Sequence, residues 1–238
     1  MKALHILKAG SKLPSLADVA GDFHDWILHA MQPADFPVNI IDARHTDPLP
    51  DMQDIAGIVV TGSSAMVTDK EPWSERAADW LRHAVDSNTP VLGICYGHQL
   101  LAYALGGKVS DNPAGIEVGT VATTLSAEAK DDELFKGLSS PLKVQASHKQ
   151  SVRLLPTHAI RLASSVMDAN HAFRFGDRVW GLQFHPEFDA QITRHYVNHY
   201  RSALQAQGAN ADQLFRQCED NGIGALVLQR FFKCVAER

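Results

Sequence analysis

Short apolar runs alternate with helical patterns along the first half of the chain. The apolar runs lie at 3–8, 38–42, 55–61 and 91–94. Alternation of this kind is typical of parallel strands that are joined by helices. The runs at 55–61 and 91–94 are nearly continuous, as expected for strands that are buried on both faces. The pattern therefore predicts a mostly parallel sheet covered by helices, with these two strands at its centre.

Two helices are predicted beside the central strands. In residues 72–87 apolar side chains recur at helical spacing, and Pro72 is acceptable in a first helical turn. A second apolar helix at 97–105 follows directly on the strand at 91–94, and Gly106 and Gly107 end it. The strand at 91–94 is therefore expected to turn sharply into a helix.

Helical periodicity is scarce in residues 108–184. Short strand-like runs lie there at 120–125, 142–145, 159–163, 172–175 and 179–184. These runs predict a small antiparallel or mixed extension of the sheet, and we expect the last of them to return to the parallel core.

The segment after Asp189 is predicted to be helical. It carries two apolar stripes, Ile192, Tyr196, Tyr200 and Leu204, and Ile223, Val227, Phe231 and Cys234. We expect residues 191–238 to form a helical extension that packs on the same domain as residues 1–190. Phe231 and Phe232 are expected in the core rather than at an interface between protomers.

Composition limits the classes of partner. The chain has 238 residues, of which 45% are hydrophobic and 21% charged, so it can bury a large core. A net charge of -5 and a pI near 6.2 give no basic surface for a nucleic acid. No apolar run approaches the roughly 20 residues that span a bilayer, and the first residues lack a signal-peptide pattern. We expect a cytoplasmic protein without a nucleic-acid or membrane partner.

Cysteine and histidine spacing predicts neither disulfides nor a metal site. Cys95, Cys218 and Cys234 form no close pair and no CxxC motif, which fits a reducing compartment. His195 and His199 have helical spacing, but the glutamate of an HExxH motif is missing, so a surface helix is the better interpretation. We expect no metal and no cofactor.

Cys95 has the surroundings of a nucleophile. It lies between Gly93 and Gly97, at the junction of the strand at 91–94 with the following helix. This arrangement is typical of a nucleophile elbow, a sharp turn that presents the side chain at the carboxyl edge of the sheet. The amides at the start of the helix favour a thiolate. Cys218 and Cys234 lie on helical stripes, where a small buried hydrophobe is the better interpretation.

A partner for this cysteine is predicted at the end of the run 179–184. His185 and Glu187 are separated by Pro186, and in extended backbone residues two apart project from the same face. Pro186 favours that extended conformation at His185. Glu187 is expected to accept a hydrogen bond from one ring nitrogen of His185 while the other nitrogen faces Cys95. The three residues predict a Cys-His-Glu catalytic triad.

Taken together, these motifs resemble the class I glutamine amidotransferases. Three blocks carry the resemblance in the family's order, and they are IVVTGS at 58–63, GICYGHQL at 93–100 and GLQFHPE at 181–187. The resemblance covers roughly residues 1–190. It implies an α/β fold of the flavodoxin-like type, a three-layer sandwich with a mostly parallel central sheet, helices on both faces and a small antiparallel extension.

The resemblance also implies a reaction. Cys95 would attack the side-chain amide carbon of glutamine, ammonia would leave, and water would release glutamate from a γ-glutamyl thioester, with His185 moving the protons. The backbone amides of Tyr96 and of the turn at Gly62 and Ser63 would form the oxyanion hole, in which one donor can be worth about 3 kcal/mol.

Further positions match the family's substrate-binding residues. Gln99 lies one helical turn after Cys95, on the same face, and Ser147 and His148 match a second binding segment. The first turn departs from the family pattern, which has two glycines followed by proline, whereas this sequence has TGSS at 61–64. A side chain at Ser63 limits the backbone there, so the oxyanion hole is expected to be less complete or to need a partner.

Three functions remain open from the sequence. The first is a GMP-synthase-like glutamine amidotransferase that supplies ammonia to a separate synthase chain, because the roughly 50 residues after Glu187 hold no second catalytic domain and no P-loop occurs. The second is a stand-alone γ-glutamyl hydrolase or peptidase, which the TGSS turn also resembles. The third is a non-catalytic regulatory protein of the same fold, against which the presence of all three triad residues argues.

Overall fold

A computed structural model describes residues 2–31 and 37–237. The strands of this part of the chain form a nine-stranded sheet in the order β2-β1-β3-β4-β11-β10-β9-β6-β7 and a separate pair, β5-β8. Their bounds are β1 Ala3–Lys8, β2 Val38–Asp42, β3 Ile55–Val60, β4 Val91–Ile94, β5 Lys108–Asp111, β6 Glu117–Leu125, β7 Leu142–His148, β8 Gln150–Leu154, β9 Ile160–Ser164, β10 Ala172–Phe175 and β11 Val179–Leu182.

The sheet has a parallel half and an antiparallel half. Strands β2, β1, β3, β4 and β11 pair in parallel, whereas β10, β9, β6 and β7 continue the sheet by antiparallel pairing. The predictions of a mostly parallel sheet, of an antiparallel extension and of a last run that returns to the parallel core are thus confirmed. Strands β3 and β4 lie inside the parallel half, as their continuous burial predicted.

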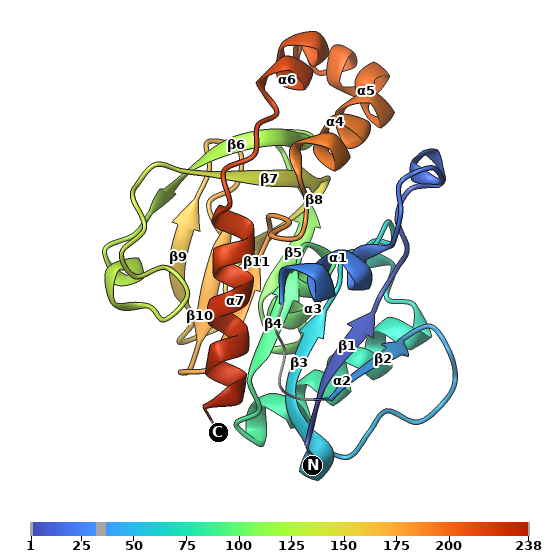
Figure 1. The fold of residues 1–238 in the computed structure, drawn as a ribbon, viewed down its shortest axis with the longest axis vertical. Coiled ribbons are helices and arrows are strands. Elements are labelled where there is room, and N and C mark those ends of the chain that lie inside the picture. The colour runs from blue at the N-terminus through green and yellow to red at the C-terminus, as the bar shows by residue number, and fades with distance from the viewer. Residues whose placement is uncertain (1, 32–36, 238) are drawn as a thin grey trace.

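Two helices cover each face of the sheet. On one face, α2 (Pro72–Asp86) and α3 (Tyr96–Ala104) close an apolar core with β3 and β4. On the other face, α1 (Phe23–Ala30) and α7 (Ile223–Ala236) close a second core. Figure 1 shows α7 running along the sheet beside α1, and α7 also contacts β3 and β7. The fold is the α/β three-layer arrangement expected from the sequence.

The segment between the sheet and α7 forms a group of short helices. These are α4 (Ala190–His199), α5 (Arg201–Ala206) and α6 (Ala211–Gln217), which pack near one end of β6 (Figure 1). In the described part of the chain, 3-10 turns lie at η1 Pro14–Leu16, η2 Met52–Asp54, η3 Val67–Asp69 and η4 Glu128–Asp131. The predicted stripe through Tyr200 is interrupted, because α4 ends before Tyr200 and α5 begins after it.

The sequence-based prediction missed one helix and two strands. Helix α1 was not predicted, although it carries a capping box in which the side chain of Asp22 accepts from the amide of Asp25 and the side chain of Asp25 accepts from the amide of Asp22. Strands β5 and β8 were also missed, since they form only a short two-stranded ribbon.

Within residues 2–31 and 37–237, none of the helices has both the length and the apolar character needed to span a bilayer.

Candidate active site

Cys95 occupies a strained backbone position between β4 and α3. Its φ of 50° and ψ of -100° lie in a region of backbone conformation that residues other than glycine rarely adopt. The turn depends on close backbone contacts, because a Cβ on Gly97 would lie 2.4 Å from the carbonyl oxygen of Val60. A Cβ on Gly93 would likewise lie 2.4 Å from the carbonyl oxygen of Gly97. These two glycines permit the elbow that the sequence predicted.

The elbow places the thiol of Cys95 in a closed environment. Only 6% of the residue is exposed, and its backbone N–H donates to the carbonyl of Leu182 over 2.8 Å. The Sγ atom lies 3.6 Å from the carbonyl oxygen of Ser147. Since β4 and β11 are parallel neighbours, the same sheet edge carries Cys95 and the residues that follow β11.

His185 and Glu187 form a buried pair beside Cys95. The Nδ1 atom of His185 lies 2.8 Å from Oε1 of Glu187, and the side chains are 3% and 0% exposed. The backbone N–H of His185 donates to the carbonyl of Gln145 over 2.7 Å, and its ring stacks on Phe188 at 3.9 Å. Because Nδ1 is engaged by the carboxylate, Nε2 is the nitrogen that remains available to Cys95.

The charges around His185 favour its protonated form. Burial by itself lowers the pKa of this imidazole, but the negative charges of Glu187 and of Cys95 outweigh burial and raise the pKa to about 10. At neutral pH His185 is therefore an imidazolium, with the carboxyl group of Glu187 and the sulfur of Cys95 beside it. This arrangement can supply a thiolate for attack and a proton for a leaving group.

The turn after β3 lies against Cys95 and His185. A Cβ on Gly62 would lie 2.9 Å from Cε1 of His185 and 3.8 Å from Cβ of Cys95, so this turn runs directly past the pair. Ser63 turns its hydroxyl back to accept from the amide of Ala65 over 3.1 Å. Tyr96 lies at the start of α3, where its backbone amide has no helical partner, and its hydroxyl lies 2.6 Å from the hydroxyl of Ser74.

Gln99, Ser147 and His148 gather on one side of Cys95. All three line a cavity of about 40 Å3 together with Cys95 and Tyr96. The amide nitrogen of Gln99 donates to the carbonyl of Gln150 over 2.8 Å and to Oε1 of Gln183 over 3.0 Å. The structure thus brings the three predicted substrate-binding residues together, although the amide nitrogen of Gln99 already has protein partners.

His148 belongs to a buried cluster that the sequence did not reveal. Its Nε2 lies 2.8 Å from Oε2 of Glu117, and the same oxygen lies 3.1 Å from Nε2 of His171. The other carboxylate oxygen of Glu117 accepts from Ser165 over 2.7 Å, and Nδ1 of His148 lies 2.9 Å from the carbonyl of Gln150. Both ring nitrogens of His148 are therefore occupied within the protein.

Within the described residues, this cluster is also the group with metal-ligand geometry. The ligand atoms of Glu117, His148 and His171 lie within 4.8 Å of one another, and all three residues are buried. Their direct hydrogen bonds account for the arrangement without an ion, since the histidines keep the pKa of the Glu117 carboxyl well below its ordinary value despite burial. A sequence signal that could have indicated the cluster is Glu117, a charged residue between the apolar Ile116 and Val118.

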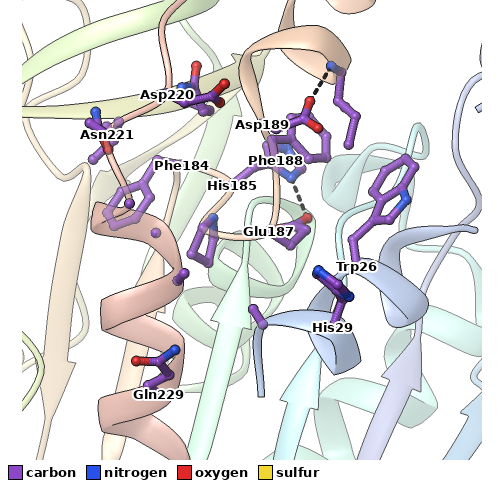
Figure 2. A pocket seen from close by; sticks show the side chains of 18 of the residues that line it. Trp26, His29, Phe184, His185, Glu187, Phe188, Asp189, Asp220, Asn221 and Gln229 are labelled. Carbon is purple, nitrogen blue, oxygen red and sulfur yellow. Dashed lines mark hydrogen bonds and ion pairs between the residues drawn. The ribbon is translucent and has the colours of Figure 1, made fainter. Parts of the chain in front are cut away.

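A larger cavity of about 680 Å3 lies on the other side of the His185–Glu187 pair (Figure 2). Residues of α1, of the segment 184–189 and of the start of α7 line it, whereas Cys95 is not among them. Figure 2 shows Trp26 and His29 facing the pair from α1 and Gln229 reaching the cavity from α7. His185 and Glu187 therefore lie between this cavity and the small cavities beside Cys95.

One edge of an α/β sheet thus joins a cysteine at a strained elbow to a buried His-Glu pair. The family model described as "Glutamine amidotransferase class-I" matches residues 15–199 of this chain. The chain belongs to the class I glutamine amidotransferase family.

Several known proteins are similar to the chain. It is 35% identical over 150 residues to GMP synthase (glutamine-hydrolyzing) 1 of Bacteroides thetaiotaomicron, a match that covers 60% of this chain and 28% of that protein. It is 31% identical over 170 residues to a GMP synthase (glutamine-hydrolyzing) subunit of Methanothermobacter thermautotrophicus, covering 70% of this chain and 84% of that protein. It is 34% identical over 144 residues to gamma-glutamyl peptidase 4 of Arabidopsis thaliana, covering 60% and 57%.

The fold has a close counterpart among solved structures. A glutamine amidotransferase from Thermotoga maritima superposes with a TM-score of 0.76 at 20% identity, covering 100% of this chain and 99% of that chain. At this level of identity the likeness establishes the fold alone.

Proposed function

We propose that the protein hydrolyses the side-chain amide of glutamine to glutamate and ammonia through a γ-glutamyl thioester on Cys95. The observation that carries this proposal is the strained Cys95 elbow beside a buried pair whose imidazole has a raised pKa. Family membership supports it, since amide hydrolysis is the chemistry to which this arrangement is suited.

The residues act in two half-reactions. The thiolate of Cys95 attacks the amide carbon, and the amides of Ser63 and Tyr96 stabilise the oxyanion. His185 donates its proton to the leaving nitrogen, so the C–N bond breaks and ammonia departs from the acyl-thioester. Water then attacks the thioester carbon, His185 accepts a proton from it, and glutamate is released as the thiolate re-forms. Glu187 holds Nδ1 of His185 throughout and stabilises its positive charge.

The test is a turnover assay with purified protein. Incubation with glutamine is expected to release glutamate and ammonia in equal amounts, and Cys95→Ala is expected to abolish both. Acid quenching during turnover with labelled glutamine is expected to leave label on the wild-type protein and none on Cys95→Ala. Full turnover by Cys95→Ala contradicts the proposal.

We also propose that the ammonia passes to a separate synthase chain in the cytoplasm. The likeness to the Methanothermobacter protein, which is described as one subunit of a GMP synthase, supports this partner. Adding the partner is expected to raise glutamine turnover. Ser63 in place of glycine limits the backbone of the oxyanion turn, and binding of the partner would complete the oxyanion hole.

A second candidate function is γ-glutamyl peptide hydrolysis. The likeness to gamma-glutamyl peptidase 4 and the TGSS turn favour it. The two functions share the thioester and differ in the leaving group, so a comparison of glutamine with γ-glutamyl dipeptides separates them.

A further inference from the structure

The cavity of about 680 Å3 beside the His185–Glu187 pair has no part in the proposed reaction. It lies between α1, the segment 184–189 and the start of α7, and we call it the α1–α7 cavity. Its volume falls within the range of roughly 300 to 1,000 Å3 that is typical of small-molecule sites. The α1–α7 cavity is therefore large enough for an organic molecule.

One buried oxygen of the His185–Glu187 pair lacks a partner at this cavity. Oε1 of Glu187 lies 2.8 Å from Nδ1 of His185, whereas Oε2 is buried and has no hydrogen-bond partner among the described residues. The side chain of Glu187 is 0% exposed, and the residue lines the α1–α7 cavity (Figure 2). A buried oxygen without a partner costs free energy. An N–H donor in the cavity is the partner that this oxygen lacks.

The charged groups along the cavity favour a cation. Three carboxyl groups line it, those of Glu187, Asp189 and Asp220, and the imidazolium of His185 balances one of them. Asp189 and Asp220 are exposed, and each uses one oxygen to accept from an amide at the start of α4, over 2.7 and 2.6 Å. Among the described residues that line the cavity, the remaining titratable group is His29, and none is a lysine or an arginine. The lining therefore leaves two negative charges without a balancing cation.

Apolar side chains form much of the remaining lining. They include Trp26 of α1, Phe184, Phe188 and Ile192 of α4. The ring of Trp26 lies edge-on to that of Phe188 at 5.8 Å, and Figure 2 shows Trp26 facing the His185–Glu187 pair. The faces of aromatic rings attract organic cations. The cavity therefore suits a ligand that has an apolar body and a positive charge.

We propose that the α1–α7 cavity binds a small organic cation, whose N–H groups donate to Oε2 of Glu187 and whose charge is balanced by Asp189 and Asp220. The inference goes beyond the proposed function, because this binding involves neither Cys95 nor the amide substrate. A positive charge beside Glu187 disfavours the imidazolium of His185. The occupied cavity is therefore expected to lower the pKa of His185, the residue that moves the protons in the proposed reaction.

The experiment uses three ring compounds of similar size that differ in charge. Benzamidine is cationic, benzamide is neutral and benzoate is anionic. Isothermal titration calorimetry measures the binding of each compound to the wild-type protein in the absence of glutamine. Benzamidine is expected to bind at least about tenfold more tightly than benzamide or benzoate, because only its amidinium group combines N–H donors with a positive charge.

Variants test whether benzamidine binds in the α1–α7 cavity. Ala225→Phe fills the cavity from α7 and is expected to abolish the binding of benzamidine. Asp220→Asn removes a negative charge, keeps an oxygen for the start of α4, and is expected to weaken this binding about fivefold. Asp177→Asn is the matched control, because its side chain is 97% exposed and lies outside the lining, and it is expected to bind benzamidine as the wild-type protein does. Circular dichroism identifies any variant that does not fold, and the comparison of the three compounds needs no variant.

Titration of the His185 ring by NMR tests the link to the His185–Glu187 pair. Saturation with benzamidine is expected to lower the pKa of His185 from about 10, because the added positive charge opposes the imidazolium. Benzamide at the same concentration is the control and is expected to leave this pKa unchanged. An unchanged pKa of His185 with benzamidine bound contradicts the placement of the cation beside Glu187.

The outcomes separate the inference from the proposed function. Equal binding of the three compounds, or unchanged binding of benzamidine by folded Ala225→Phe, overturns the inference and leaves the proposed function standing. Cys95→Ala, which is expected to abolish turnover, is expected to bind benzamidine as the wild-type protein does. Absence of glutamine turnover by the wild-type protein overturns the proposed function and leaves the cation site standing.

Discussion

At the scale of single residues, the charge on His185 depends on two neighbours. Glu187 accepts from Nδ1 over 2.8 Å, and Cys95 contributes the second negative charge. Burial opposes the protonated form, and the interactions with Glu187 and Cys95 together outweigh it and raise the pKa of His185. Substitution of either neighbour is therefore expected to change the pKa of His185.

Replacing Glu187 by glutamine tests this coupling directly. The pKa of His185 is expected to fall from about 10 toward or below its ordinary value of 6.5, because burial remains and one negative charge is lost. Turnover is expected to fall by about 100-fold or more, as the imidazolium loses its partner. Titration of the His185 ring by NMR gives the pKa, with Glu133→Gln, an exposed carboxylate, as the control. An unshifted His185 in Glu187→Gln contradicts the assignment.

The same pair predicts a pH dependence of stability. A folded-state pKa above the unfolded value contributes stability that is fully present below about 6.5 and is lost as the pH rises through about 10. The free energy of unfolding of the wild-type protein is therefore expected to fall over this range by more than that of Glu187→Gln. Urea titrations across this interval of pH measure the difference, and parallel curves for the two proteins contradict it.

At the scale of elements, a buried ionic cluster ties the antiparallel half of the sheet to the active site. Glu117 begins β6, His148 ends β7, and His171 directly precedes β10. Ser147, the neighbour of His148, has the carbonyl that lies 3.6 Å from the thiol of Cys95. The cluster therefore fixes the end of β7 against Cys95.

Glu117→Gln is expected to lower the free energy of unfolding by about 3 kcal/mol, because it removes the counter-charge of buried histidines. The folded pKa of Glu117 is lowered, so its contribution is present above the ordinary value of 4.5 and declines as the pH falls below it. The gap between wild-type and variant stability is thus expected to narrow below pH 4.5. Chemical denaturation at neutral pH and at about pH 4 measures the gap, and a gap that widens in acid rules out this role.

Glycines near the two ends of α3 are expected to respond differently to substitution by alanine. Gly97→Ala is expected to abolish turnover, because the new Cβ would lie 2.4 Å from the carbonyl oxygen of Val60 and the turn at Cys95 must shift. Gly106 has a φ of 91° and open space around it. Gly106→Ala is therefore expected to cost only about 1 kcal/mol of stability and to keep turnover. Activity and thermal melting of both variants provide the comparison.

At the scale of the whole molecule, the last helix completes the core on one face of the sheet. Phe231 and Phe232 are 0% and 6% exposed, and the ring of Phe231 lies 6.1 Å from that of Trp180 in β11. Gly224 lets the start of α7 approach the His185–Glu187 segment, because a Cβ there would lie 2.2 Å from the carbonyl oxygen of Pro186. Helix α7 therefore supports the segment that carries His185 and Glu187.

Phe231→Ala is expected to lower the free energy of unfolding by about 3 to 5 kcal/mol, because it opens a cavity in a packed core. Gln229→Ala, an exposed position of the same helix, is expected to stay within about 0.5 kcal/mol of the wild-type value. Denaturant titrations compare the two variants. Equal stability of Phe231→Ala and the wild-type protein contradicts a core role for α7.

The sequence indicated most of the parallel half of the sheet. Runs such as 91–94 are continuously apolar, and burial on both faces follows from that pattern. The bounds of β6 were less accurate, because Glu117 is a charged residue and the predicted strand began at Thr120. Its burial depends on His148 and His171, which come from other segments. A pattern along one segment does not contain such partners.

The sequence by itself identified the reactive residues whose arrangement depends on near neighbours in the chain. The glycines around Cys95 and the spacing of His185 and Glu187 follow from backbone geometry within a few residues, so local sequence specifies them. Only the tertiary structure decided what surrounds these residues, namely the Glu117 cluster, the approach of Leu13, Tyr196 and Tyr200 to Cys95, and the return of α7 to the sheet. These contacts join segments that are far apart in the chain, and the packing of the whole core brings them together.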